Sequence, residues 1–131
     1  MTTKRILAVD DDASISEFYQ TALKMLGFDV AVAASARAAK AAIAAQRPDL
    51  ILMDIMMPDQ DGISFTRELR NDAKTSDIPI LMVSGLADAG TLQDALLFGA
   101  VGYLVKPVDA DALKAKIDST LAALEHRKKP S

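Results

Sequence analysis

The sequence predicts an α/β fold in which helices cover both faces of one parallel β-sheet. Short apolar segments alternate five times with longer segments of helical spacing. One of the short segments, residues 50–53, is apolar without interruption, which is typical of a strand buried on both faces. Because the connections are short, each strand and the helix after it are expected to form a right-handed crossover. A chain of 131 residues that is 50% apolar is large enough for one such domain.

The chain begins with a strand and a helix. Residues 6–9 are a short apolar strand that runs into three consecutive aspartates. A helix follows, and either Asp12 or Ser14 can cap it; in the second case Glu17 completes a capping box. Gly27 ends this helix. Its apolar side is expected to consist of Ile15, Phe18, Leu23, Met25 and Leu26.

An alanine-rich helix separates the second strand from the third. Residues 28–33 form the second strand, and a serine then opens a helix over residues 35–46. Pro48 prevents this helix from continuing. The apolar residues 50–53 form the third strand, which delivers Asp54 to its carboxyl end.

The second half of the chain repeats the alternation of strand and helix. Its last helix has apolar residues at helical spacing between positions 113 and 124. We expect one domain over residues 1–126, followed by a basic tail or the start of a linker over residues 127–131. The predicted elements are a helix at 61–70, a polar loop at 71–77, a strand at 78–83, a helix at 88–98, a strand at 101–105 and a helix at 109–126.

Polar side chains follow four of the predicted strands, at the point where each strand ends. Asp10 and Asp11 follow the first strand, and Asp54 follows the third. Ser84 ends the fourth strand, and Lys106 follows the fifth. In open α/β sheets the ligand crevice lies outside the carboxyl ends of the strands. If these four strands lie side by side, the polar residues converge on one site.

Three converging carboxylates repel one another and are tolerated only by protonation or by a cation. An all-oxygen ligand set suits Mg²⁺, which prefers a site completed by water and phosphate. A lysine supplies positive charge for a tetrahedral anion, and a serine hydroxyl can donate to one of its oxygens. These groups together predict phosphoryl transfer, with Asp54 as the nucleophile that becomes an aspartyl-phosphate. The sole histidine, His126, lies in the charged tail, so the chain lacks the usual general base for fast turnover.

The motifs that contain these residues resemble the receiver domain of bacterial two-component response regulators, a CheY-like domain. The similarity covers nearly the whole chain, and the motifs follow in the order and spacing of the family. They are Val9-Asp10-Asp11, the segment from Leu52 to Pro58 with Asp61-Gly62, Ser84-Gly85, and Tyr103-Leu104-Val105-Lys106-Pro107.

The resemblance implies the flavodoxin-like fold with the strand order 2-1-3-4-5. It implies that Asp54 accepts a phosphoryl group from a histidine kinase or a histidine phosphotransfer protein. It further implies that Asp11, Asp54 and the backbone carbonyl of Met56 hold Mg²⁺. Asp10 is expected to help hold the ion directly or through a water molecule.

The resemblance also assigns a switch. Ser84 occupies the Ser/Thr switch position of the family, and Tyr103 occupies the aromatic switch position. In this family the hydroxyl moves to the phosphoryl group and the ring turns inward. The face made by the fourth helix, the fifth strand and the fifth helix then changes, which controls a partner or an output domain. The bond between Lys106 and Pro107 is expected to be cis.

Two features depart from the family pattern. The pair Asp59-Gln60 is more polar and acidic than the residues often found there, and it is expected to affect the electrostatics of the metal site. Met56 and Leu86 stand two residues after the phosphoacceptor and the switch serine. The family uses these positions to tune attack by water. Because both side chains are apolar, we expect slow self-dephosphorylation.

Composition and charge favour a soluble, cytoplasmic protein whose partners are proteins. The balance of 15 basic and 18 acidic residues disfavours nucleic acid or an anionic membrane as a partner. The absence of cysteine excludes disulfides and fits a reducing compartment. The apolar run at residues 6–9 is too short for a signal peptide or a membrane span. The basic residues 127–129 are expected to complement the dipole of the last helix, and Met53, Met56 and Met57 to pack in the core.

Other functions compete with a phosphorylated signalling module. A receiver fold can act as a protein-binding module without phosphorylation. A Mg²⁺-dependent phosphohydrolase is disfavoured because Met56 stands where such an enzyme needs an acid. A flavin carrier is disfavoured because no phosphate-cradling loop follows the first strand. We therefore predict a phosphoacceptor and not an enzyme, monomeric at rest, with dimerisation on phosphorylation left open and the kinase and the output target unidentified.

Overall fold

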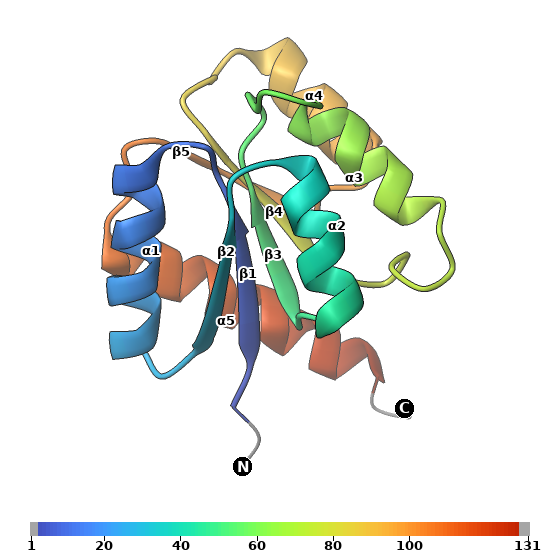
Figure 1. The fold of residues 1–131 in the computed structure, drawn as a ribbon. Coiled ribbons are helices and arrows are strands. Elements are labelled where there is room, and N and C mark those ends of the chain that lie inside the picture. Colours follow the sequence, from blue (N-terminus) through green and yellow to red (C-terminus); the bar gives the residue numbers. More distant parts are fainter. Residues whose placement is uncertain (1–2, 129–131) are drawn as a thin grey trace.

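Five strands form a parallel sheet at the centre of the fold (Figure 1). They are β1 (Arg5–Val9), β2 (Asp29–Ala33), β3 (Leu50–Met53), β4 (Ile80–Ser84) and β5 (Gly102–Val105). Their spatial order is β2-β1-β3-β4-β5. The structure is a computed structural model that describes residues 3–128. It confirms the predicted α/β class and the strand order that the family resemblance implies.

Five helices cover the two faces of the sheet (Figure 1). One apolar layer lies on each face. They are α1 (Ala13–Met25), α2 (Ala36–Ala45), α3 (Gly62–Arg70), α4 (Ala89–Leu97) and α5 (Ala110–Lys128). The first layer joins the sheet to α1 and α5, and the second joins it to α2, α3 and α4. Helices on both faces confirm the predicted architecture.

The strand β3 is buried on both faces, as its uninterrupted apolar sequence predicts. Leu50 and Leu52 pack in the layer under α1 and α5. Ile51 and Met53 pack in the layer under α2, α3 and α4, because successive side chains of a strand point to opposite faces. Each of the four side chains is at most 1% exposed. Burial of a side chain of this size contributes about 1.5–3 kcal/mol, so the position of the next residue, Asp54, is firmly set.

Polar side chains cap all five helices at the edge of the sheet where the strands end. Asp12 caps α1, and its Oδ1 accepts hydrogen bonds from the Ser14 amide at 2.9 Å and the Ile15 amide at 3.4 Å. Of the two candidate caps of this helix, Asp12 is therefore the one in use. The predicted cap of α2 is confirmed as well, since the Ser35 side chain accepts from the amide of Ala38. Each cap contributes about 1 kcal/mol.

The strand β4 begins later than predicted. The expected start was residue 78, whereas the strand starts at Ile80. Pro79 has no N–H group to donate to a neighbouring strand, and the amide of Ile78 donates instead to the Thr75 carbonyl at 3.1 Å. The paired register with β3 therefore begins at Ile80, while the Pro79 carbonyl still accepts a hydrogen bond from the Ile51 amide at 2.9 Å.

The helix α5 extends two residues past the predicted end at residue 126, to Lys128. The remainder of the predicted basic tail, residues 129–131, lies outside the described residues. The division between domain and tail stays a prediction. Within residues 3–128, no helix has both the length and the apolar composition needed to cross a membrane.

Two side chains differ from the predicted burial, and a third, for which none was predicted, is buried. Met25 is 83% exposed and Met56 is 65% exposed, so the prediction that they pack in the core is wrong. Met53 and Met57 do contact the core. On α1, Tyr19 is buried instead, with 2% of its surface exposed. At about 3.6 residues per turn, the helix face that contains Tyr19 does not contain position 25.

Gly62 is expected to be essential for stability because the chain folds back tightly where α3 begins. A Cβ atom there would lie 2.9 Å from the Asp54 carbonyl carbon and 3.0 Å from Ile55 Cα. We expect Gly62→Ala to lower the free energy of unfolding by about 2–3 kcal/mol in urea denaturation. Gly90→Ala is the control, since the nearest atom to a Cβ there is 3.6 Å away; it should change stability by less than about 1 kcal/mol. Equal stability of the Gly62 variant and the native protein would contradict this expectation.

Candidate functional site

The pairing of β1 with β3 brings two of the predicted aspartates together. Val9 is the partner of Met53 in the parallel register, so the next residues, Asp10 and Asp54, leave the sheet side by side. The Asp54 amide donates to the Val9 carbonyl at 2.9 Å, and the Asp10 amide donates to the Ala33 carbonyl at 3.0 Å. Backbone hydrogen bonds therefore fix the start of both loops.

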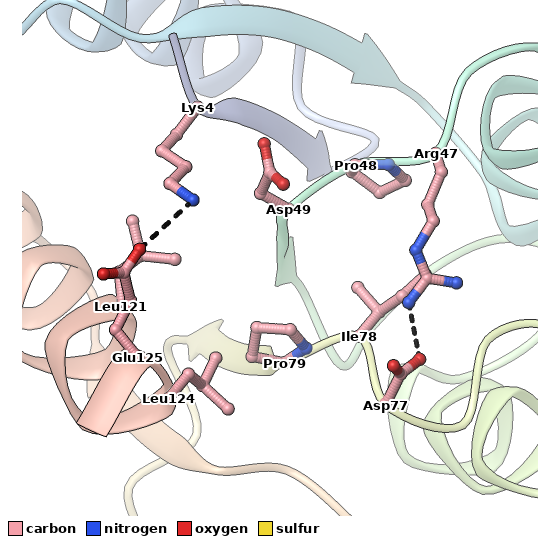
Figure 2. A pocket seen from close by; sticks show the side chains of 10 residues that line it. All are labelled: Lys4, Arg47, Pro48, Asp49, Asp77, Ile78, Pro79, Leu121, Leu124 and Glu125. Atoms are coloured by element: carbon pink, nitrogen blue, oxygen red, sulfur yellow. Dashed lines mark hydrogen bonds and ion pairs between the residues drawn. The ribbon is translucent and has the colours of Figure 1, made fainter. Parts of the chain in front are cut away.

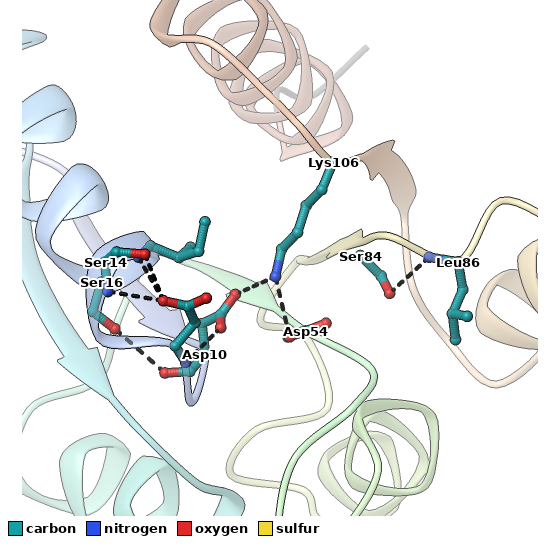
Figure 3. Close-up of polar contacts among 9 residues, drawn as sticks. Asp10, Ser14, Ser16, Asp54, Ser84, Leu86 and Lys106 are labelled. Atoms are coloured by element: carbon teal, nitrogen blue, oxygen red, sulfur yellow. Dashed lines mark hydrogen bonds and ion pairs between the residues drawn. The ribbon is translucent and has the colours of Figure 1, made fainter.

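The pairing of β4 with β5 places the other predicted residues at the same edge. Ser84 is the partner of Val105, and the Lys106 amide donates to the Ser84 carbonyl at 2.8 Å. The peptide bond between Lys106 and Pro107 is cis. From this point the Lys106 side chain extends across the ends of the strands toward the aspartates (Figure 3).

Three carboxylates form the centre of the site. Asp10, Asp11 and Asp54 each present an oxygen, and these oxygens lie within 4.8 Å of one another. Asp10 and Asp54 are buried, whereas Asp11 is exposed to solvent. A compact set of oxygen donors that is open on one side fits Mg²⁺, which keeps part of its hydration shell. The predicted convergence of these aspartates is therefore present in the fold.

The ammonium group of Lys106 lies between the two buried carboxylates. Its Nζ is 2.6 Å from Asp10 Oδ2 and 3.2 Å from Asp54 Oδ2 (Figure 3). Buried carboxylates are tolerated when a cation pairs with them. The shorter distance shows that Lys106 pairs more closely with Asp10, and the Asp54 carboxylate is the less compensated of the two.

The pKa values reflect this unequal pairing. Burial raises the pKa of Asp54, and repulsion from Asp10 raises it further, against the opposing effect of Lys106. For Lys106, burial acts to lower the pKa. The hydrogen bond to Asp10 and the attraction of both carboxylates outweigh burial, so the pKa of Lys106 is raised. The lysine therefore stays protonated, whereas the charged form of Asp54 is costly without further positive charge.

The other side of the Asp10 carboxylate is held by the start of α1. Its Oδ1 accepts a hydrogen bond from the Asp12 amide at 3.0 Å, while Oδ2 faces Lys106. The Ser16 hydroxyl donates to the backbone carbonyl of Asp10 at 3.3 Å. With both oxygens engaged, Asp10 has a fixed orientation.

The predicted switch residues meet at the backbone of Leu86. The Ser84 side chain is buried, and its Oγ accepts a hydrogen bond from the Leu86 amide at 3.3 Å (Figure 3). The Tyr103 hydroxyl donates to the Leu86 carbonyl at 2.6 Å. Partial burial raises the pKa of Tyr103, and the neighbouring Ser84 hydroxyl partly offsets this effect. One residue of the loop after β4 thus connects the two side chains.

A separate hollow of about 430 Å³ lies at the opposite edge of the sheet (Figure 2). Its charged side chains are engaged with one another or with the backbone. Lys4 Nζ is 3.7 Å from Glu125 Oε1, and Arg47 is paired with Asp77. Asp49 accepts a hydrogen bond from the backbone at the start of β1. Among the described residues, those that line this hollow do not form a metal-binding group like the one at the carboxyl edge.

Comparison with known proteins identifies the family. A family profile described as the response regulator receiver domain matches residues 6–118. The chain belongs to this family. The match confirms the resemblance to receiver domains that the sequence motifs predicted. In the structure, the aspartates of these motifs lie at the carboxyl edge of the sheet.

Individual relatives agree with this membership. A protein of Cyanophora paradoxa named "Probable transcriptional regulator ycf27" is 40% identical over 123 residues, which cover 94% of this chain and 50% of that protein. A CheY-like receiver domain protein from Methanospirillum hungatei is 32% identical with a TM-score of 0.89, covering 96% and 99% of the two chains. The chemotaxis protein CheY4 of Vibrio cholerae is 31% identical with a TM-score of 0.86, covering 90% and 98%. This chain spans about half the length of the curated relative from Cyanophora.

Several contacts of the site could not be found from the sequence. The Asp12 amide holds Asp10, and the Leu86 carbonyl holds Tyr103; both are backbone groups, which leave no signature in residue type. The buried Tyr19 of α1 is a different case. Burial, and then the charges of Asp10 and Asp54, raise its pKa. Its position on the helix is the available sequence signal, because it shares the face of the predicted apolar residues.

Asp54→Asn is expected to stabilise the fold in the absence of divalent cations. The change removes one of the three clustered carboxylates, while the new amide oxygen can still accept a hydrogen bond from Lys106. We expect the free energy of unfolding in urea with EDTA to rise by about 1 kcal/mol. Asp72→Asn is the control: Asp72 is exposed on a distant loop, and the effect should stay below about 0.5 kcal/mol. A less stable Asp54 variant would show that repulsion among the carboxylates is not the dominant effect.

Proposed function

We propose that this receiver domain accepts a phosphoryl group on Asp54 and carries a signal in a two-component system. The observation that supports this proposal best is the position of Lys106, whose Nζ reaches both buried carboxylates of a three-aspartate cluster. Such a cluster provides oxygen donors for a metal ion and an ammonium group for a phosphoryl oxygen. The phosphoryl donor is a histidine kinase or a histidine phosphotransfer protein, as family membership suggests.

Asp10, Asp11 and Asp54 would hold Mg²⁺ together with the backbone carbonyl of Met56. When bound, Mg²⁺ neutralises charge on the phosphoryl oxygens during transfer. The fixed orientation of Asp10 supports a role in holding the ion directly or through a water molecule. Asp11, which is exposed, can approach an ion from the solvent side.

Asp54 would act as the nucleophile. One of its carboxylate oxygens forms a bond to the phosphorus of a phosphohistidine. The P–N bond breaks, its electron pair returns to the imidazole nitrogen, and the histidine is left without its phosphoryl group. Lys106 already donates to Asp54 Oδ2 at 3.2 Å, so it is placed to donate to a phosphoryl oxygen. Most of the rate enhancement then comes from positioning and electrostatic stabilisation.

Ser84 and Tyr103 would transmit the change to the surface. If the Ser84 hydroxyl turns toward the phosphoryl group, it gives up the hydrogen bond from the Leu86 amide. The Leu86 carbonyl, which holds Tyr103, is then free to move with the loop. The face of α4, β5 and α5 changes as a result. Exposed apolar side chains on and beside these elements suit a protein partner: Leu96, Leu97, Val101 and Val105.

The output is proposed to be a downstream protein or an output domain in a longer chain. The Cyanophora relative is named a transcriptional regulator and is about twice as long as the matched region. Direct binding of nucleic acid is not assigned to the receiver domain itself, whose net charge is −3. The proposed resting state is a monomer, and a dimer is one possible form of the phosphorylated protein.

The domain is proposed to store a phosphoryl group and not to act as an enzyme with rapid turnover. Met56 is 65% exposed and Leu86 is 36% exposed. Neither side chain has a polar group that orients a water molecule for attack on phosphorus. Slow loss of the phosphoryl group follows from this arrangement.

Acetyl phosphate provides a direct test of the acceptor chemistry. We expect the native protein to gain one phosphoryl group in the presence of Mg²⁺, measured by intact mass. The gain should vanish in EDTA and in Asp54→Ala, because the first lacks the cation and the second lacks the nucleophile. Asp72→Ala is the matched control and should react like the native protein.

Two results would contradict the proposal. Modification of Asp54→Ala would place the phosphoryl group elsewhere. A native protein that gains no mass, even at short times, would favour a binding module that acts without phosphorylation.

The lifetime of the phosphoryl group tests the role of Met56. We expect Met56→Asn to increase the rate constant of dephosphorylation by roughly tenfold, which corresponds to about 1.4 kcal/mol of the barrier. The reason is that an amide can orient the attacking water. Met56→Leu keeps an apolar side chain and should leave the rate nearly unchanged. The rate is followed by intact mass after removal of acetyl phosphate, and equal rates for both variants would rule out this role.

A further inference from the structure

Asp59 connects the loop after the phosphoacceptor to a distant helix. It lies between β3 and α3, and its side chain reaches the first residues of α2. Oδ1 accepts a hydrogen bond from the Ala36 amide at 3.1 Å, and Oδ2 accepts one from the Arg37 amide at 2.9 Å. Both carboxylate oxygens are therefore used by backbone groups that are 23 and 22 residues earlier in the chain.

The helix α2 thus has two caps of different origin. Its own N-cap residue, Ser35, accepts from the Ala38 amide at 3.1 Å. Asp59 accepts from the two preceding amides, which have no partner within the helix. Local capping needs only Ser35. The additional cap from Asp59 has a further effect, because it joins two segments that are far apart in the sequence.

Besides the packing of Met57 against the core, the rest of the loop has few other hydrogen bonds. At the start of the loop, the Asp54 amide donates a hydrogen bond to the Val9 carbonyl. At its end, the Gly62 amide donates one to the Ile55 carbonyl at 2.7 Å. Between these points, the Gln60 side chain donates to Glu68 of α3 at 3.4 Å, which is a long and exposed contact. Within the described part of the chain, the two hydrogen bonds of Asp59 are the ones that join residues 56–60 to an element other than α3.

We propose that Asp59 is a positioning residue that holds this loop against α2 and thereby sets the backbone carbonyl of Met56 for Mg²⁺. The inference rests on the proposed function, which assigns Met56 to the metal site. Asp59 acts through the backbone and does not contact the ion. Its carboxylate faces the amino end of α2, where the helix dipole favours a negative charge.

This role differs from the electrostatic effect expected from the sequence. If the charge of Asp59 attracted Mg²⁺ from a distance, Asp59→Asn and Asp59→Ala would weaken binding equally, because both remove the charge. If Asp59 positions the loop, Asp59→Asn should have the smaller effect. Its side-chain oxygen can still accept one hydrogen bond from α2, whereas alanine accepts none.

The test measures Mg²⁺ affinity by isothermal titration calorimetry on the native protein, Asp59→Ala, Asp59→Asn and Ser35→Ala. Ser35→Ala is the matched control, since it removes a cap from the same helix and leaves the connection to the loop intact. We expect Asp59→Ala to raise the dissociation constant for Mg²⁺ about tenfold, the lower end for loss of a residue that supports a metal ligand. Asp59→Asn should give a smaller rise, and Ser35→Ala should match the native value.

Amide hydrogen exchange without metal gives a second readout. In Asp59→Ala we expect faster exchange of the Ala36 and Arg37 amides together with the loop amides of Met56, Met57, Asp59 and Gln60, since Pro58 has no N–H. In Ser35→Ala these four loop amides should exchange at the native rate. This pattern reports the connection itself and does not depend on phosphorylation.

The possible results separate the inference from the proposed function. Equal Mg²⁺ affinity of Asp59→Ala and Ser35→Ala would overturn the inference, and Asp59 would be a helix cap alone. Equal weakening by Asp59→Ala and Asp59→Asn, with native exchange in residues 56–60, would replace positioning by a direct charge effect. A native protein that binds no Mg²⁺ would overturn the proposed metal site first, and the inference with it.

Discussion

The structure of the site depends on how the positive charge of one lysine is shared between two buried, negatively charged carboxylates. Asp10 and Asp54 are almost removed from solvent, and Lys106 Nζ lies 2.6 Å from the first and 3.2 Å from the second. A buried carboxylate is costly unless it is paired. The single charge of Lys106 does not neutralise the cluster, because the exposed carboxylate of Asp11 adds a third negative charge to those of Asp10 and Asp54. The same excess of negative charge that makes the cluster costly favours a divalent cation beside it, so the proposed metal binding and this local cost have one cause.

The surrounding fold holds this unstable arrangement in place. The side chains of β3 are buried on both faces, and the register with β1 sets Asp54 beside Asp10. By contrast, the contacts that extend from the site toward the surface are single hydrogen bonds. Ser84 and Tyr103 each make one with the backbone of Leu86. A well-packed sheet with loops held by single hydrogen bonds at its carboxyl edge suits the proposed function, in which the acceptor stays fixed and the surface changes on modification.

Much of the fold and part of the site were predictable from the sequence, for identifiable reasons. The uninterrupted apolar run before Asp54 predicted a doubly buried strand, and the alternation of segments predicted the parallel sheet. Predictions failed where residue type does not determine position. Met56 is apolar but 65% exposed, because it follows a strand in a loop that turns outward. Tyr19, for which no burial was predicted, is buried because the turn of the helix places it on the inner face. The charge of Asp59 was evident from its residue type, but the helix that it caps was not.

By itself the sequence determined the class of fold, the family, and the identity of the polar residues at the ends of the strands. These properties follow from local patterns, namely the period of apolar residues and the spacing of motifs. Only the tertiary structure decided the unequal pairing of Lys106 with Asp10 and Asp54, the meeting of Ser84 and Tyr103 at Leu86, and the bond from Asp59 to α2. The physical reason is that these contacts join segments far apart in the chain, often through backbone groups. Every residue carries such groups, so their partners are chosen by the packing of the whole fold.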